Sequence, residues 1–144
     1  MVHTIKPHSK VIDVADKDFV SLDENTLVAE AARIMYERDV GSVIVTLNDS
    51  ETLARQSVGI ITARDFLNRV VAQSKGPFKV VLRDIISTPL ITIHKDALTN
   101  DAIMLMKDKN IARLPVINEA GEVLGIVSLR TLIGRAEQIN SISV

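Results

Sequence analysis

The chain contains the same sequence pattern twice, and this repeat constrains its fold more than any other feature. The octapeptide Gly59–Phe66 (GIITARDF) returns as Gly125–Leu132 (GIVSLRTL). Upstream, Leu27 aligns with Leu98 at an offset of 71 (98 − 27), whereas the octapeptides align at an offset of 66 (125 − 59). The extra residues of the first copy fall in the polar run Leu47–Thr52, where turn-forming residues tolerate an insertion. The repeat therefore predicts two similar half-domains, and with them two similar sites in the cleft between the half-domains.

Each copy has the hydrophobic pattern of strand, helix, strand, strand and helix. Asn25 and Asp96 stand where a helix N-cap is expected, and apolar residues then follow at the spacing of one buried helix face. The predicted buried faces are Leu27, Ala31, Ile34 and Met35 in the first copy and Leu98, Ala102, Leu105 and Met106 in the second. The expected strands are 19–22, 42–45 and 58–61, then 90–93, 114–117 and 123–127, and the closing helices are 63–73 and 129–138.

These patterns divide the chain into five segments. They are an N-terminal extension 1–10, a first repeat 11–73, a linker 74–81, a second repeat 82–138 and a C-terminal tail 139–144. One copy of about 60 residues leaves its sheet half covered, so two copies must pack together to bury what each exposes. The predicted fold class is α/β (α+β), with tandem β-α-β-β-α repeats packed with pseudo-two-fold symmetry into one domain.

Composition excludes several classes of protein. The 144 residues are 47% hydrophobic and 24% charged, which is typical of a globular protein, and the net charge of −1 makes nucleic acid an unlikely partner. The absence of cysteine excludes disulfides, thiolate metal sites and a cysteine nucleophile. No stretch approaches the roughly 18 apolar residues of a membrane span, and the start MVHTIKPHSK has no signal-peptide core. We therefore expect a cytoplasmic protein without a membrane partner.

The repeated unit resembles the CBS domain (cystathionine β-synthase domain) family. The resemblance rests on a tandem β-α-β-β-α unit that ends in Gly-h-h-Thr-x-x-Asp, where h is apolar. The family's lead-in to each copy is similar to Asp13-Val14 and to Asp84-Ile85. Its Thr-Pro-x-h-Thr segment is similar to Thr88–Thr92, and its His-Arg-h-Pro-Val-h-Asp strand is similar to Ile111–Asn118. From about residue 11 to residue 136, the chain looks like a stand-alone CBS pair.

The resemblance implies a regulatory function. CBS pairs bind adenosyl ligands such as AMP, ADP, ATP or S-adenosylmethionine in the clefts between repeats and transmit occupancy to a partner protein. They also commonly pair into discs of four repeats. We therefore expect a non-enzymatic, energy-sensing type of module that forms a homodimer, needs no cofactor and signals to an unknown partner.

Asp65 is the residue in which we expect the ligand specificity to lie. A carboxylate in the first turn of a helix offers two acceptor oxygens to the neighbouring hydroxyls of a ribose, and the family's aspartate does this work. The alternative is a capping box between Thr62 and Asp65, and both roles can coexist. Thr62 and Ser128 place hydroxyls beside helix amides, where they could contact a ligand or act only as N-caps. Thr131 replaces the aspartate in the second copy, which predicts a weaker or differently selective second site.

Arg113 is the expected phosphate contact, as the family often has an arginine at this place. A guanidinium offers a fork of charged donors, although a surface ion pair is the alternative. Its counterpart in the first copy is Ser42, so one favoured site is predicted from Asp65 and Thr62 of one copy plus Arg113 of the other.

Apolar residues are expected to flank the adenine. The predicted set is Phe19, Val20 and Ile61, for which an ordinary place in the core is the alternative. The remaining predicted ligand contacts are Pro115 and Arg130. Arg130 matches Arg64 on the first turn of the second helix, and for this pair simple solvent exposure is the alternative.

Catalysis and metal binding have no support in the sequence. No Ser-His-Asp order, P-loop or dinucleotide fingerprint is present, and His3, His8 and His94 show no metal-ligand spacing, so we expect them at the surface. Two other functions stay open. A scaffold that acts by dimerisation or docking without ligand would explain Thr131, and a nucleic-acid-associated regulator is disfavoured by the charge.

Overall fold

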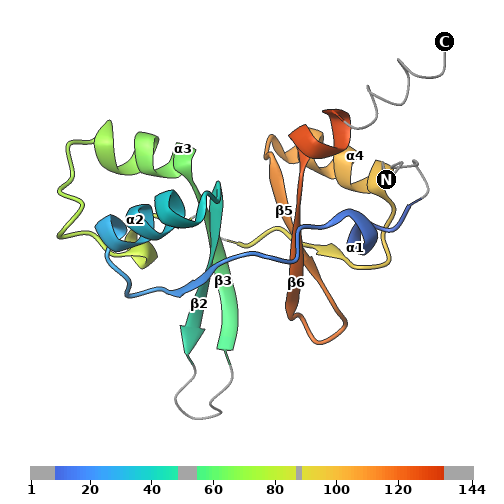
Figure 1. Ribbon diagram of the computed structural model, residues 1–144, viewed down its shortest axis with the longest axis horizontal. Helices are drawn as coiled ribbons and strands as arrows, with labels where there is room; N and C mark the ends of the chain where they lie inside the picture. Colours follow the sequence, from blue (N-terminus) through green and yellow to red (C-terminus); the bar gives the residue numbers. More distant parts are fainter. Residues whose placement is uncertain (1–8, 49–54, 87–88, 135–144) are drawn as a thin grey trace. The chain divides into compact units, whose positions relative to one another are not determined.

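Two three-stranded mixed sheets form the framework of the molecule. The computed structural model describes residues 9–48, 55–86 and 89–134 (Figure 1). The first sheet has the order β1 (Ser21–Asp23), β2 (Ser42–Asn48) and β3 (Arg55–Thr62). The second has the order β4 (Ile93–His94), β5 (Arg113–Ile117) and β6 (Val123–Ser128). In each sheet the first pair of strands is parallel and the second pair antiparallel. The predicted α/β class and the tandem repeat are thereby confirmed.

The two sheets share the same irregularity. The register shifts between Val45 and Thr46 in β2 and between Val116 and Ile117 in β5, which are equivalent positions at the offset of 71. The first strands begin later than the sequence indicates, at residues 21 and 93. The six-residue connection 49–54, which contains most of the predicted insertion, lies outside the described residues.

The compact units of the structure are offset from the repeats of the sequence. One unit comprises residues 19–90, and the other combines the described residues 9–18 with 91–134. We call them the 19–90 unit and the 91–134 unit. Helix α1 (Val11–Val14), which precedes the first repeat's strands, packs against β6, and its Val11 is fully buried in the core of the 91–134 unit. The short 3₁₀ segment η2 (Leu82–Asp84) is the corresponding lead-in of the 19–90 unit, where Leu82 is fully buried.

Backbone carbonyls of residues that immediately precede these lead-in segments cap the long helices. Helix α2 (Val28–Arg38) begins after Leu27, and the amides of Val28 and Ala29 donate to the carbonyls of Val80 (2.8 Å) and Pro77 (3.0 Å). Helix α4 (Thr99–Lys109) begins after Leu98, and the amide of Thr99 donates to the carbonyl of Ser9 at 2.8 Å. The N-cap residues Leu27 and Leu98 have no side chain that could accept a hydrogen bond, so these long-range carbonyls satisfy free helix amides instead, and at α4 the Asp101 carboxylate also accepts the amide of Leu98 at 3.4 Å.

The predicted N-caps are therefore wrong. Asn25 donates its backbone amide to the Asp23 carboxylate at 2.8 Å and lies in the turn after β1, and Asp96 lies in the matching turn after β4. The later start also changes the buried faces. Ala31, Met35, Ala102 and Met106 are buried as expected. Leu27 and Leu98 are 38% and 36% exposed because they are the extended residues before the helices, and Val28 and Thr99 are buried in their place.

The helix that follows β3 changes type after one turn. Helix α3 (Ala63–Phe66) passes into a π-helical segment, η1 (Leu67–Val71), in which the amide of Ala72 donates to the carbonyl of Leu67 at 2.8 Å. Helices α2 and α3 lie on the same side of the β2–β3 pair (Figure 1). Val28 and Ala31 of α2 share a core with Ile61 of β3 and Val70 of η1. In the second copy, residues 129–134 are helical, and the rest of the expected helix lies outside the described residues.

The glycine that opens each repeated octapeptide makes room for a lead-in segment. A Cβ on Gly125 would lie 2.9 Å from the Cβ of Ala15 and 2.9 Å from the carbonyl oxygen of Asp16. A Cβ on Gly59 would lie 3.0 Å from the Cβ of Ile86. Ala15 and Ile86 are equivalent at the offset of 71. Each lead-in therefore passes closely over the third strand of its unit, so that a Cβ would have no space at Gly125 and would crowd the Ile86 side chain at Gly59.

We predict that Gly125→Ala lowers the free energy of unfolding by about 1–3 kcal/mol, because the added methyl group forces backbone away from β6. Gly59→Ala should cost less, since a side chain can give way more easily than a carbonyl. The matched control is Gly76→Ala, where the nearest atoms are 4.0 Å away and a change within about 0.5 kcal/mol is expected. Urea unfolding measures all three variants. Equal stability of Gly125→Ala and Gly76→Ala would contradict the close crossing.

Candidate functional site

The end of β3 and the start of α3 form a closed capping box around Asp65. Thr62 has an extended backbone (φ −116°, ψ 167°) and is the N-cap of α3. Oδ2 of Asp65 accepts two hydrogen bonds from Thr62, from the backbone amide at 2.8 Å and from Oγ1 at 3.1 Å. The Thr62 hydroxyl in turn accepts from the backbone amide of Asp65. The capping interpretation is therefore confirmed, and ribose binding stays a prediction that must share the same carboxylate.

A cation stands on the other side of the Asp65 carboxylate. Nε of Arg69 lies 3.8 Å from Oδ1 of Asp65, and Nη1 of Arg69 donates to the carbonyl of Ile85 at 2.8 Å. The Asp65 side chain is 23% exposed, so the carboxylate is accessible at the unit's surface while held on two sides. Sequence reasoning missed Arg69, although its position four residues after Asp65 on a helix is the signal that could have found it.

The apolar residues predicted to flank an adenine lie mainly in the core of the 19–90 unit. Ile61 is fully buried and Val20 is 7% exposed, whereas Phe19 is half-buried. The carbonyl of Val20 already accepts the amide of Ile44 at 2.8 Å. The structural role of Val20 and Ile61 as core residues is thus observed, and Phe19 keeps the most surface for a ligand.

The matching place in the 91–134 unit has hydroxyls where the first has a carboxylate. Ser128 ends β6, and its Oγ accepts the backbone amide of Thr131 at 3.2 Å and donates to Thr131 Oγ1 at 2.7 Å. Arg113 begins β5 and pairs in register with Ser128, so the structure brings these two predicted residues together. Pro115 is buried in β5 and Arg130 is exposed. Of the predicted contacts, the 19–90 unit holds five (Phe19, Val20, Ile61, Thr62 and Asp65), and the 91–134 unit holds four (Arg113, Pro115, Ser128 and Arg130).

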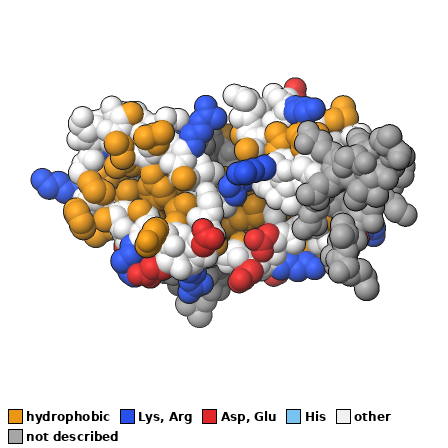
Figure 2. All heavy atoms as spheres, turned by 45° about the horizontal axis from the view of Figure 1, so that its top comes forward, with side chains coloured by type: hydrophobic (Ala, Val, Ile, Leu, Met, Phe, Trp, Pro, Cys, Tyr) orange, Lys and Arg blue, Asp and Glu red, His pale blue; other side chains and the backbone are white. Residues whose placement is uncertain are grey.

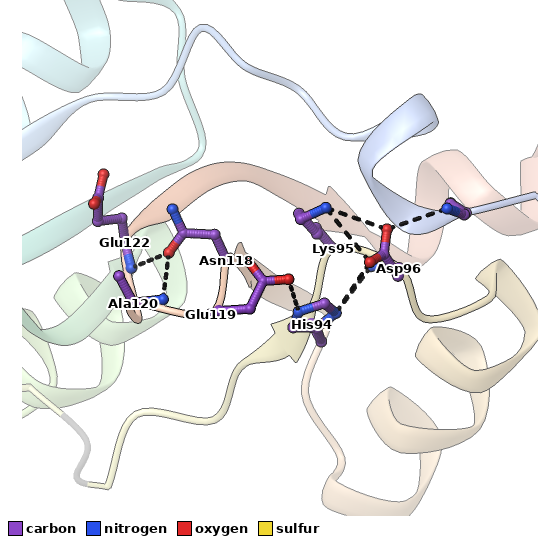
Figure 3. A network of polar contacts seen from close by, with 8 residues as sticks. His94, Lys95, Asp96, Asn118, Glu119, Ala120 and Glu122 are labelled. Carbon is purple, nitrogen blue, oxygen red and sulfur yellow. Dashed lines mark hydrogen bonds and ion pairs between the residues drawn. The ribbon is translucent and has the colours of Figure 1, made fainter.

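A second polar cluster surrounds His94 (Figure 3). His94, Asp96 and Glu119 each have one atom that could ligate a metal ion, a ring nitrogen or a carboxylate oxygen, and these atoms lie within 4.8 Å of one another. The backbone amide of Asp96 lies 3.2 Å from Nδ1 of His94, so Nδ1 accepts a hydrogen bond and the neutral ring carries its proton on Nε2. Nε2 then donates to the Glu119 carboxylate at 3.1 Å. His94 is at the surface as expected, but its two acidic neighbours come from turns, so no helical spacing in the sequence indicates that they meet.

The turns that carry this cluster are themselves held by polar contacts. Oδ1 of Asn118 accepts the amides of Ala120 and Glu122, both at 3.0 Å, and fixes the β5–β6 turn that bears Glu119. Lys10 of the lead-in and Lys95 both donate to Asp96, at 3.3 Å and 3.4 Å. The imidazole nitrogens are both engaged and Asp96 is neutralised by two ammonium groups, so the cluster is a satisfied hydrogen-bond network that ties α1's segment to the turn after β4.

Comparison with known proteins decides the family. The family model of the CBS domain matches residues 11–72 and 82–137. The chain belongs to the CBS domain family. The tandem CBS pair predicted from the repeat is thereby confirmed.

Three similar proteins give context for this CBS pair. An uncharacterized protein, MK0525, of Methanopyrus kandleri is 37% identical over 121 residues, and the match spans 84% of this chain but only 59% of that relative. The CBS domain protein PAE2072 from Pyrobaculum aerophilum, solved in complex with AMP, has a TM-score of 0.78 at 26% identity, covering 94% of this chain and 100% of that one. The CBS pair of protein MJ0100, solved with 5-methylthioadenosine and S-adenosyl-L-methionine, has a TM-score of 0.77 at 26% identity, covering 93% and 99%.

Among the helices of the described residues, none is long and apolar enough to cross a membrane.

The lysine contacts of the CBS pair's His94 cluster give a prediction on pH. The pKa of the Asp96 carboxyl lies below its ordinary value of 3.8, chiefly because Lys10 donates a hydrogen bond to it. The pKa of Glu119 is also lowered, first by a backbone hydrogen bond and then by His94. A carboxyl whose pKa is lowered on folding stabilises the protein above its unfolded-state pKa, and this contribution is lost as pH falls through the folded-state pKa.

We predict that Lys10→Met raises the pKa of Asp96 toward 3.8 and moves the onset of acid unfolding to higher pH. NMR titration of the side-chain carboxyl carbon measures the first effect, and circular dichroism against pH measures the second. Lys17→Met is the matched control, because Lys17 is an exposed lysine of the same segment. A pKa of Asp96 that is the same in Lys10→Met and the native protein would refute the role of Lys10.

Proposed function

We propose that this CBS pair binds an adenosyl ligand, among AMP, ADP, ATP and S-adenosylmethionine, and that occupancy regulates a partner protein. The observation that carries the proposal is the set of acceptors left free around Asp65. Oδ2 is used twice by Thr62, but among the described residues the only ion-pair partner of Oδ1 is the more distant Arg69 at 3.8 Å. The Thr62 hydroxyl has two lone pairs, and one of them accepts the amide of Asp65. One lone pair of Thr62 Oγ1 and those of Asp65 Oδ1 remain for a ligand.

These two atoms match the hydroxyls of a ribose. Vicinal hydroxyls are neighbouring donors, and an ionised carboxylate oxygen is the stronger of the two acceptors. The 2′- and 3′-hydroxyls would therefore divide between Oδ1 of Asp65 and Oγ1 of Thr62. This division differs from the sequence-based expectation that both carboxylate oxygens take the diol, because the capping box already occupies Oδ2.

The similar structures support an adenosine-containing ligand. One contains AMP and the other contains 5-methylthioadenosine and S-adenosyl-L-methionine, and all three molecules share adenosine with its ribose diol. Arg113 lies in the 91–134 unit, where it is half-buried at the start of β5 and pairs in register with Ser128. A charged fork of donors suits a phosphate better than a sulfonium group, so a ligand that reaches Arg113 would be a nucleotide in preference to S-adenosylmethionine.

The proposal predicts that isothermal titration calorimetry with AMP, ADP, ATP and S-adenosylmethionine detects binding below millimolar, and that 2′-deoxy-AMP binds more weakly than AMP. Asp65→Asn should weaken binding by about tenfold to a hundredfold, because a hydrogen bond to a charged acceptor is lost. A saturating ligand should also stabilise the native protein, by about 2.7 kcal/mol at a hundred times its Kd.

The matched control is Asp101→Asn. Asp101 accepts the amide of Leu98 at the start of α4 at 3.4 Å, so this variant also loses a helix-capping carboxylate, but on another helix. It should lose stability without losing affinity. Absence of binding by all four ligands would refute the proposed function, and equal affinities of Asp65→Asn and Asp101→Asn would refute the role of Asp65.

A ligand-free scaffold is the second candidate function, and the Ser128–Thr131 pair favours it for the second copy. These hydroxyls hydrogen-bond to each other at 2.7 Å, so no charged acceptor is left for a diol. Such a copy would act as a structural surface for dimerisation or docking and would not select a ligand. The nucleotide panel also tests this alternative, which predicts no thermal stabilisation by any ligand.

An apolar surface on the helices of the 19–90 unit supports homodimer formation. Tyr36 on α2 is 86% exposed, and Leu67 and Val71 on η1 are 58% and 67% exposed. A shallow hollow between α2 and α3 is lined by Tyr36 together with Ala32, Met35, Val40, Ala63 and Phe66, and the acidic residues Glu37 and Asp39 complete its lining. Figure 2 shows hydrophobic side chains gathered over this unit on the face in view. Large exposed apolar side chains beside small ones suit the packing of helices from a second copy.

We predict that Tyr36→Asp shifts the protein from dimer to monomer, because a charge must then be buried in the apolar interface. Size-exclusion chromatography with light scattering measures the mass. Phe78→Asp is the matched control, since Phe78 is an aromatic residue of similar exposure (77%) in the linker. A monomeric native protein, or a Tyr36→Asp variant that stays dimeric, would contradict this interface.

A further inference from the structure

Arg69 joins the Asp65 carboxylate to the lead-in segment Leu82–Ile86 of the same unit. Its Nε lies 3.8 Å from Oδ1 of Asp65, and its Nη1 donates to the carbonyl of Ile85 at 2.8 Å. Both partners are well placed by their own contacts. Asp65 is held by the capping box, and the Ile85 side chain is 2% exposed in the core of the 19–90 unit.

The π-helical turn places Arg69 between these two partners. Arg69 is the central residue of η1, where the amides of Ala72 and Lys75 donate to the carbonyls five residues earlier, at 2.8 Å and 3.0 Å. A π-turn is wider than an α-turn and is often found at functional sites. The guanidinium is planar and rigid, so a displacement at its Asp65 end changes the geometry of the bond at its Ile85 end.

The two contacts differ in strength. The Arg69–Asp65 pair is partly exposed and longer than a hydrogen bond, so it contributes little to stability and can rearrange easily. The bond to Ile85 is 2.8 Å long and part-buried, and it joins a charged donor to the carbonyl of a buried residue. Arg69 is thus anchored on the lead-in and presents its Nε to the one Asp65 oxygen that the capping box leaves free.

The lead-in lies near the C-terminal end of the 19–90 unit, just before the chain passes to the other unit. Its backbone is held by the amides of Leu82 and Arg83, which donate to the carbonyls of Thr26 (3.0 Å) and Glu24 (2.9 Å). After Ile86 the chain continues to Ile91, where the 91–134 unit begins. The lead-in therefore lies within a few residues, along the chain, of the covalent connection between the two units.

We propose that Arg69 is a positioning residue that aims Oδ1 of Asp65 at the ligand and transmits occupancy of Asp65 to the lead-in Leu82–Ile86. The inference rests on the proposed adenosyl function and adds a route by which binding reaches the rest of the chain. A ribose hydroxyl on Oδ1 fixes the carboxylate, the fixed carboxylate orders the guanidinium, and the ordered guanidinium strengthens the bond to Ile85. Because coupling is reciprocal, a firmly held lead-in also favours ligand binding.

Two measurements with AMP as the probe test the proposal. Calorimetry should show affinity weakened about five- to tenfold in Arg69→Met, the loss expected for one positioning contact, and partly restored in Arg69→Lys. Hydrogen–deuterium exchange of the peptide covering residues 80–86 should slow on addition of saturating AMP in the native protein. In Arg69→Met, at AMP concentrations that saturate this variant, the exchange of that peptide should no longer respond.

Arg83→Met is the matched control. Arg83 belongs to the lead-in, and its Nη1 lies 3.7 Å from the Glu24 carboxylate. This variant therefore also removes an arginine that joins the lead-in to the rest of the 19–90 unit, but its ion pair is with Glu24 and not with Asp65. It should leave both the AMP affinity and the AMP-dependent protection of residues 80–86 unchanged. Equal responses of Arg69→Met and the native protein would overturn the proposal, because the lead-in would then sense the ligand by another route.

A failure of the proposed function gives a different result. If the native protein binds no adenosyl ligand, the occupancy signal is refuted, and a double-mutant cycle without ligand decides the positioning contact. Asp65→Asn, Arg69→Met and the double variant should then change exchange of residues 80–86 non-additively. Additive changes would overturn the link between Asp65 and the lead-in as well.

Discussion

The fold depends on backbone hydrogen bonds that each lead-in segment makes to the turn after the first strand of its unit. The amide of Leu82 donates to the carbonyl of Thr26, and the amide of Val11 donates to the carbonyl of Ala97. These two bonds are equivalent at the offset of 71, as are the bonds that cap α2 and α4. From them follow the burial of Val11 and Leu82, the apolar N-cap residues Leu27 and Leu98 of the two long helices, and the glycine at the head of each octapeptide.

Much of the fold could be predicted because its signals are local. Strand and helix order, the buried alanines and methionines of the long helices, and the duplication are written in apolar periodicity. The helix starts could not be predicted, because Asn25 and Asp96 have the chemistry of N-caps while the carbonyls that cap the helices come from residues far away in the chain. No local pattern records a long-range backbone contact, so the residues with the best local capping chemistry, Asn25 and Asp96, are not the caps.

The candidate site shows the same division. The Thr62–Asp65 capping box and the replacement of Asp65 by Thr131 are visible in the octapeptides, and the structure gives each its hydrogen-bond partners. Arg69 lies four residues after Asp65, a helical spacing that the sequence does show, whereas the acidic neighbours of His94 are brought to it by turns that no sequence spacing indicates. The structure also shows that one Asp65 oxygen is already committed, which a sequence does not record.

The offset between sequence repeat and structural unit has a consequence for how such a chain can arise. A single copy bounded at residues 11–73 lacks Pro77, Val80 and Leu82, so it cannot complete the start of α2 or fill its own core. Such a copy becomes complete only if it exchanges lead-in segments with a second copy, as in a domain-swapped dimer. Fusing two copies in one chain makes that exchange intramolecular and independent of protein concentration. In this fold, duplication replaces an association equilibrium by a covalent bond.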